Sequence, residues 1–196
     1  MAPVWAPSLF RLPAGDMAGN LNAVGSFSRI PCFMRAFLAT LGIFWAVPFV
    51  ESGEIKIEPN QFQLEVIQGA EAQTGVTNGG PDNQPVVTVA VSKLGTEFWS
   101  VELRAPGIVM ESGKTYELKF RAKSAPRRYI YVVPERTEGD QSSLARGTTV
   151  QVPEEWTECT VLFHATSATA SGRLTVSSLS AEPASYWFSN FRLNEK

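Results

Sequence analysis

This 196-residue sequence contains little histidine and cysteine, and it has no excess of basic residues. One His and two Cys are too few for a tetrahedral structural zinc site built from such ligands, and they leave little for nucleophilic catalysis. The 17 Lys and Arg against 19 Asp and Glu give a formal net charge of −2. This balance excludes the basic surface of a dedicated nucleic-acid-binding protein. A β-type binding domain or an enzyme that uses carboxylates remains.

Long apolar runs are also scarce, and the clearest lies near the N-terminus. Met34 and Arg35 precede fifteen uncharged, mainly apolar residues, 36–50, and small residues follow them. This order predicts a secretory signal peptide over residues 34–52, cleaved after Ser52, and therefore an extracellular or periplasmic protein. The run is shorter than the ~20 residues of a membrane-spanning helix, and Pro48 interrupts it, so we expect no membrane span. A buried hydrophobic helix is the alternative.

Residues 1–33 carry no sustained periodicity, and Met34 stands where an initiator Met would stand. They form a leader of doubtful status, either an artefact of the start site or a long n-region. Removal of residues 1–52 leaves Cys159 as the remaining cysteine of a single domain, 53–196, which has no disulfide. A chain of this length buries enough surface to fold without such a staple.

Alternation of apolar and polar residues predicts strands through this domain. In 115–123, Tyr116, Leu118, Phe120 and Ala122 fall on one face and charged residues fall on the other. Further strands are expected at 62–67, 86–91, 99–103, 128–133 (ended by Pro134), 158–165 and 173–177, and around Phe188, Phe191 and Leu193. Short strands separated by Gly, Pro, Ser and Asn, without a helical stripe, predict an all-β antiparallel β-sandwich of the jelly-roll type.

Two central segments carry a family resemblance. Trp99-Ser-Val-Glu-Leu103 precedes Gly113-Lys-Thr-Tyr-Glu-Leu-Lys-Phe-Arg-Ala-Lys123, and Trp156 opens a later strand. This order resembles the carbohydrate-binding modules of families four and nine, over about residues 57–194. Ser189-Asn-Phe-Arg-Leu193 matches the closing signature of the family only in part. The resemblance implies a jelly roll that binds β-glucan, xylan or related chains in a cleft on one sheet, without catalysis.

Aromatic and planar polar side chains on strand faces are the candidates for a sugar site. If Ile130 and Val132 point inward, Tyr129 and Tyr131 point outward on one face; the reversed register would bury both tyrosines. Trp99 shares a face with Val101 and Leu103, which favours the core, whereas a bulge would bring it to Glu102. The resemblance makes Trp99 and Glu102 a ligand-contacting pair and points to Arg173, which faces outward with Ser177. The predicted carbohydrate-binding residues are therefore Trp99, Glu102, Tyr129, Tyr131, Arg173 and Ser177.

The resemblance also raises the question of a structural calcium ion between the chain ends. Calcium takes six to eight oxygen ligands, normally with several carboxylates. Ser189-Asn190 stands where the family has an acidic residue, and Glu58 and Asn60 are the candidates on the N-terminal side. We therefore regard no cofactor as required, with a calcium site at Glu58, Asn60 and Asn190 as the one candidate.

Three classes of function remain open. The first is a secreted, non-catalytic module that binds a β-linked polysaccharide, and we expect it to be monomeric. The second is a sandwich that binds another secreted or envelope protein and has no sugar site. The third is a jelly-roll glycoside hydrolase or lyase, which needs two matched carboxyl groups across the scissile bond. The strand carboxylates Glu102, Glu117 and Glu158 lie on separate strands, which argues against the third class.

Overall fold

The computed structural model describes residues 53–196; the predicted leader and signal peptide, residues 1–52, lie outside that range. The described part consists of strands and two short 3-10 turns, η1 (Pro59–Gln61) and η2 (Pro81–Asn83). The strands are β1 (Ile55–Ile57), β2 (Gln63–Val66), β3 (Glu71–Asn78), β4 (Pro85–Lys93), β5 (Val101–Met110), β6 (Thr115–Ala125), β7 (Arg128–Arg136), β8 (Thr148–Val152), β9 (Thr157–His164), β10 (Thr169–Ser177) and β11 (Ala184–Glu195). None of these elements is a helix long and apolar enough to cross a membrane.

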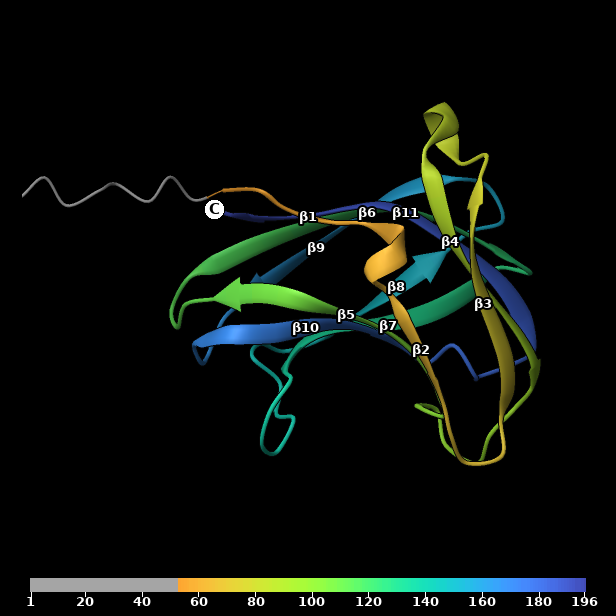
Figure 1. Ribbon diagram of the computed structural model, residues 1–196, viewed down its shortest axis with the longest axis horizontal. Coiled ribbons are helices and arrows are strands. Elements are labelled where there is room, and N and C mark those ends of the chain that lie inside the picture. Colours follow the sequence, from red (N-terminus) through yellow and green to blue (C-terminus); the bar gives the residue numbers. More distant parts are fainter. Residues whose placement is uncertain (1–52) are drawn as a thin grey trace, which may run out of the picture. The chain divides into compact units, whose positions relative to one another are not determined.

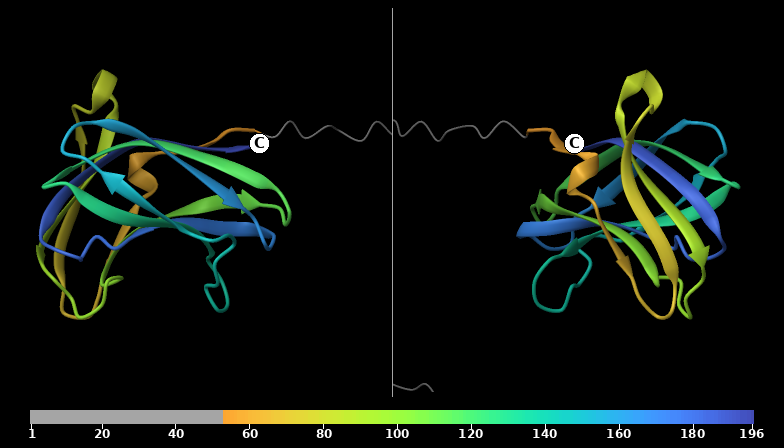
Figure 2. Two further views of the ribbon diagram at one scale, coloured as in Figure 1. Left: turned by 180° about the vertical axis from the view of Figure 1, so that it is seen from behind. Right: turned by 45° about the vertical axis from the view of Figure 1, so that its right-hand side comes forward.

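Two antiparallel sheets pack face to face, as the sequence predicts (Figure 1). Sheet A has the order β3-β4-β11-β6-β9, with β1 added beside β11, and sheet B has the order β2-β5-β10-β7-β8. Both views in Figure 2 show residues 137–147, between β7 and β8, and the β2–β3 turn projecting beyond sheet B on the same side. These two segments flank the outer face of sheet B.

The core lies between the sheets and is built by the alternation seen in the sequence. Tyr116, Leu118, Phe120 and Ala122 of β6 are buried, and the residues between them face outward, as predicted. Ile130 and Val132 of β7 are fully buried, whereas Tyr129 is 58% exposed. The outward orientation of the tyrosine face of β7 is therefore confirmed. The reversed register, which would have buried the tyrosines, is wrong.

A bulge in β11 explains how two apolar residues three positions apart share the core. Phe188 and Phe191 are both fully buried, although strict alternation would put them on opposite faces. The register against β6 shifts between Ser189 and Arg192, and Asn190 has φ 57°, the left-handed conformation that Asn tolerates. The shift turns Phe191 inward, where its ring stacks on Phe120 with a centroid distance of 4.9 Å.

Several predicted strand boundaries are wrong, and two of them affect the residues discussed below. We expected Pro134 to end the strand that starts at Arg128, but β7 continues to Arg136. Leu144 donates its N–H to the Pro134 carbonyl at 2.8 Å, so the Pro134 nitrogen faces the 137–147 loop and leaves the ladder to β10 intact. We also expected a strand from Trp99, but β5 begins at Val101 and Trp99 lies in the preceding turn.

Candidate functional site

The outer face of sheet B gathers polar and aromatic side chains from all five of its strands. Each of these residues alternates along its strand with residues that pack into the core, and the strand registers bring them into rows. Glu65 pairs with Glu102, Arg104 with Thr175, and Ser177 with Tyr131. The face comprises Gln63, Glu65, Glu102, Arg104, Pro106, Tyr129, Tyr131, Val133, Glu135, Thr149, Gln151, Arg173, Thr175 and Ser177.

One end of this face is an aromatic pocket of about 400 Å³. Phe98, Tyr129 and Tyr131 line it, together with residues of β8 and of the β10–β11 turn. Phe98 and Tyr129 are 57% and 58% exposed, which is unusual for large aromatic side chains on one small surface. Trp99 contacts Phe98 edge-on, with ring centroids 4.7 Å apart. The pocket thus offers several aromatic surfaces to a ligand.

Hydrogen bonds and close packing fix these aromatic rings. The Ser180 hydroxyl lies 3.1 and 3.0 Å from the backbone carbonyl oxygens of Glu97 and Phe98, and so ties the Phe98 turn to the β10–β11 turn. Gln151 on β8 donates its side-chain N–H to the Tyr129 hydroxyl at 2.9 Å. The Tyr131 ring lies against Gly147, where a Cβ would overlap it. These contacts hold Tyr129, Tyr131 and the backbone of the Phe98 turn in place.

At one edge of the face, on β2 and β5, lies an ion-pair network centred on Arg104. Its guanidinium binds the Glu65 carboxylate on β2 and donates to Glu102 Oε2 from Nε at 3.0 Å and from Nη2 at 2.6 Å. Glu102 is 8% exposed, so its charge is well shielded from solvent and depends on Arg104. The network holds three charged side chains in fixed orientations on the floor of the face.

A second network lies at the end of the face next to the 137–147 loop. Arg173 donates to Glu135 Oε2 from Nε at 3.1 Å and from Nη2 at 3.0 Å, and its Nη2 also reaches Gln141 Oε1 at 3.0 Å. Thr175 donates its hydroxyl to the same Glu135 oxygen at 2.7 Å. Arg104 and Arg173 share a pocket of about 220 Å³ here.

Together these parts have the chemistry that a pyranose ring requires. A sugar ring presents apolar C–H faces, which pack on aromatic rings, and hydroxyl groups, which need planar donors and acceptors with bidentate reach. The aromatic pocket supplies the former, and the Arg104 and Arg173 networks supply the latter. Each of the three carboxylates of the face, Glu65, Glu102 and Glu135, is paired with an arginine. The pairing fixes the orientation of the carboxylate, which can still accept hydrogen bonds from sugar hydroxyls.

The structure brings five of the six predicted sugar-binding residues onto this one face. Tyr129 and Tyr131 line the aromatic pocket, while Glu102 and Arg173 belong to the two networks. Ser177 lies on the same face but is 3% exposed, so it forms part of the floor beneath its neighbours. Trp99 is not on the face; it stands beside it in the turn before β5 and is 39% exposed, not buried in the core.

Sequence reasoning missed several contributors to the site, and four of them show why. Phe98 lies in a turn, where no periodicity applies, and Glu135 directly follows Pro134, the residue at which the sequence predicts the end of the strand. Glu65 and Arg104 could have been found, since Arg104 is two residues after Glu102 on the same strand face and Glu65 alternates with the apolar residues of β2. An ion pair across neighbouring strands leaves no pattern within a single segment.

The three candidate calcium ligands do not make a site that fits the ion. Glu58 is the one carboxylate among them, and it pairs with Lys56 at 2.8 Å. The Asn190 side-chain oxygen accepts a hydrogen bond from Arg192 Nε at 2.9 Å. Nowhere in residues 53–196 do three or more His, Cys, Asp or Glu side chains cluster in a way that could hold a metal ion. Calcium binding here stays a prediction without support from the donor set.

Solved structures with a similar fold include carbohydrate-binding modules. A family 4 carbohydrate-binding module is 20% identical to this chain, with a TM-score of 0.58. The match covers 71% of this chain and 89% of that one. The N-terminal cellulose-binding domain of β-1,4-glucanase C from Cellulomonas fimi is 14% identical, with a TM-score of 0.53, over 71% and 91% of the two chains. The family 22 xylan-binding domain of Paenibacillus barcinonensis Xyn10C is 15% identical, with a TM-score of 0.50, over 72% and 92%.

The family itself is identified by sequence. No curated protein matches this chain. The sequence model described as "Carbohydrate binding domain", which joins modules of families four and nine, matches residues 66–183. The match spans β3 to β10 and thus includes the lining of the aromatic pocket, the Arg104–Glu102 pair and the Arg173 network, while Glu65 lies one residue before it. This chain therefore belongs to the family of carbohydrate-binding domains that unites families four and nine.

Proposed function

We propose that the protein is a non-catalytic module that binds one chain of a β-linked polysaccharide, of the β-glucan or xylan type, along the outer face of sheet B. The single observation that carries the proposal is one outer sheet face with exposed Tyr129 at one end, where Phe98 lines the same pocket, and with the Arg104 and Arg173 networks along the rest of the face. A sugar chain needs aromatic surfaces together with oriented hydrogen-bonding groups. A surface that contacts only solvent has no need of this combination. Two proteins of similar structure, one a cellulose-binding domain and one a xylan-binding domain, support this ligand class.

The proposal assigns no catalysis to the face. A glycosidase needs one carboxyl group free to give a proton and a second one placed across the scissile bond. Glu65 and Glu102 share Arg104, and Glu135 is bound to Arg173 and Thr175. These contacts suit acceptors for sugar hydroxyls. We further propose that the protein is exported, on the strength of the signal peptide predicted at 34–52, and acts as a monomer.

Affinity electrophoresis tests the proposal. The chain is run through native gels that contain mixed-linkage β-glucan, xylan or mannan, beside a Tyr129→Ala/Tyr131→Ala double variant. We expect retardation by β-glucan or xylan that disappears in the double variant, with circular dichroism showing that the variant is still folded. Unretarded migration of the unchanged protein in every gel would contradict sugar binding and favour a protein-binding sandwich.

A further inference from the structure

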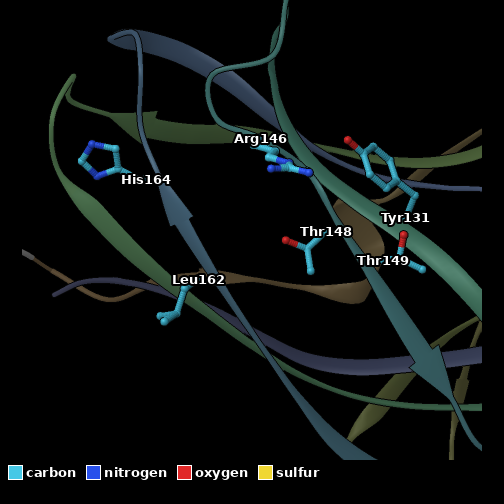
Figure 3. Close-up of a pocket in the computed structure, with 7 residues that line it drawn as sticks. Tyr131, Arg146, Thr148, Thr149, Leu162 and His164 are labelled. Atoms are coloured by element: carbon cyan, nitrogen blue, oxygen red, sulfur yellow. The ribbon is translucent and has the colours of Figure 1, made fainter.

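A second pocket, of about 590 Å³, lies beside the aromatic pocket, where the edges of the two sheets meet. Leu162 and His164 come from β9 of sheet A, and Thr148 and Thr149 from β8 of sheet B, with Arg146 just before it (Figure 3). Tyr131 and Gly147 complete the lining. No arginine network fills this space, in contrast to the face of sheet B.

The two pockets are neighbours because they share two residues. Tyr131 and Thr149 line both the aromatic pocket and this side pocket. The Tyr131 ring is held in place by Gly147, which directly follows Arg146. A substituent that branches from a sugar ring in the aromatic pocket can therefore extend past Tyr131 and Thr149 into the side pocket, which Arg146 lines.

The charge of the side pocket is opposite to that of the rest of the site. Among the described residues that line it, none is acidic and Arg146 is a cation. Arg146 is exposed and has no Asp or Glu oxygen within 4.0 Å in residues 53–196, whereas Arg104 and Arg173 are both bound to carboxylates. The chain as a whole has a formal net charge of −2. A guanidinium without an acidic partner beside hydroxyl groups is suited to an external anion.

We propose that this side pocket binds the carboxylate of a uronic acid unit carried by the polysaccharide. The inference rests on the proposed function, since the sugar chain must occupy the aromatic pocket. The planar guanidinium of Arg146 matches a carboxylate through two parallel N–H···O bonds, and the Thr148 and Thr149 hydroxyls add donors within the same pocket. The preferred ligand is then an acidic, substituted polysaccharide, in which the carboxylate adds about tenfold to the affinity.

Two matched pairs of polysaccharides test this inference by isothermal titration calorimetry. The first pair is glucuronoxylan and the same polymer after carboxyl reduction, and the second is β-glucan before and after oxidation of its C6 hydroxyls to carboxylates. Arg146→Gln is the test variant. Arg127→Gln is the control. Arg127 is also exposed and forms no salt bridge within residues 53–196, but it lines a different pocket. The control removes the same charge elsewhere.

We expect the protein to bind a carboxylated polymer about tenfold more tightly than its neutral partner. Arg146→Gln should remove this difference and leave affinity for the neutral partner unchanged, and Arg127→Gln should preserve the difference. Equal binding of neutral and carboxylated polymers overturns the inference and leaves the proposed function standing. A preference that survives Arg146→Gln, or a variant that loses neutral binding as well, also overturns it. Failure to bind all four polymers contradicts the proposed function, and the inference falls with it.

Discussion

Replacement of Tyr129 by Ala should change polysaccharide binding with little change in stability, so the two effects can be measured separately. Tyr129 is 58% exposed, so about 120 Å² of its ~200 Å² surface is open to solvent. A sugar ring that covers half of this removes about 60 Å² from water, which at ~25 cal/mol per Å² is worth about 1.5 kcal/mol. Tyr129→Ala should therefore weaken polysaccharide binding about tenfold.

This change should have little effect on the stability of the folded state. The Tyr129 ring lies outside the core, and its one side-chain hydrogen bond, from Gln151, is exposed. We expect the free energy of unfolding to fall by less than about 1 kcal/mol. Titration calorimetry measures the affinity, with the polysaccharide that retards the protein in the gels as the ligand. Urea denaturation measures the free energy of unfolding.

Two variants make the comparison specific. Tyr129→Phe keeps the ring and should retain most of the affinity, because the platform rather than the hydroxyl is the proposed contact. Trp156→Ala removes an aromatic residue that contacts Lys123 on sheet A, away from the outer face of sheet B, and this variant should bind the polysaccharide normally. An unchanged affinity in Tyr129→Ala, or an equal loss in Trp156→Ala, would refute the placement of the sugar over Tyr129.

Three further predictions concern stability. Arg104→Met leaves the Glu65 and Glu102 carboxylates side by side without their shared cation, and should lower the free energy of unfolding by about 1–3 kcal/mol in urea titrations; an unchanged midpoint contradicts the network. Burial raises the pKa of the Cys159 thiol from 9.0 to about 11 and of Tyr186 from 10.0 to about 12, so both groups stabilise the fold below pH 9 and lose this contribution as pH rises. The Cys159 share, about 2 kcal/mol lost between pH 9 and 11, should be absent in Cys159→Val; an equal alkaline loss in that variant would disprove it. EDTA or added Ca²⁺ should leave Tm unchanged in differential scanning calorimetry, and a rise with Ca²⁺ would mean a donor set other than the one seen.

The fold was predictable because its main strands are half-buried and alternate strictly. The β6 and β9 segments show this pattern along their whole length, since one face meets the core and the other meets solvent. β3 was not predicted, because it is an edge strand whose residues are nearly all exposed and therefore carry no apolar period. The three-residue β1 is too short for any periodicity, and its pairing with β11 depends on tertiary structure.

The site was predictable where it follows strand alternation and unpredictable where it depends on pairing between strands. Tyr129 and Tyr131 follow from the inward orientation of Ile130 and Val132. The partnership of Arg173 with Glu135 requires the β7–β10 register and a strand that passes through Pro134, and neither is written in a local pattern. Pro134 is tolerated because its nitrogen faces a loop, a fact of topology and not of propensity.

The central claim is that the outer face of sheet B binds the sugar chain, and an NMR titration tests it most directly. Cellohexaose and xylohexaose are added in turn to the isotopically labelled protein, and backbone amide shifts are followed. The account predicts that one or both ligands shift amides of β5, β7 and β10 around Glu102, Tyr131 and Arg173 and leave the outer face of sheet A, around Lys123 and Trp187, unaffected. Shifts confined to sheet A, or no shifts with either ligand, would contradict it.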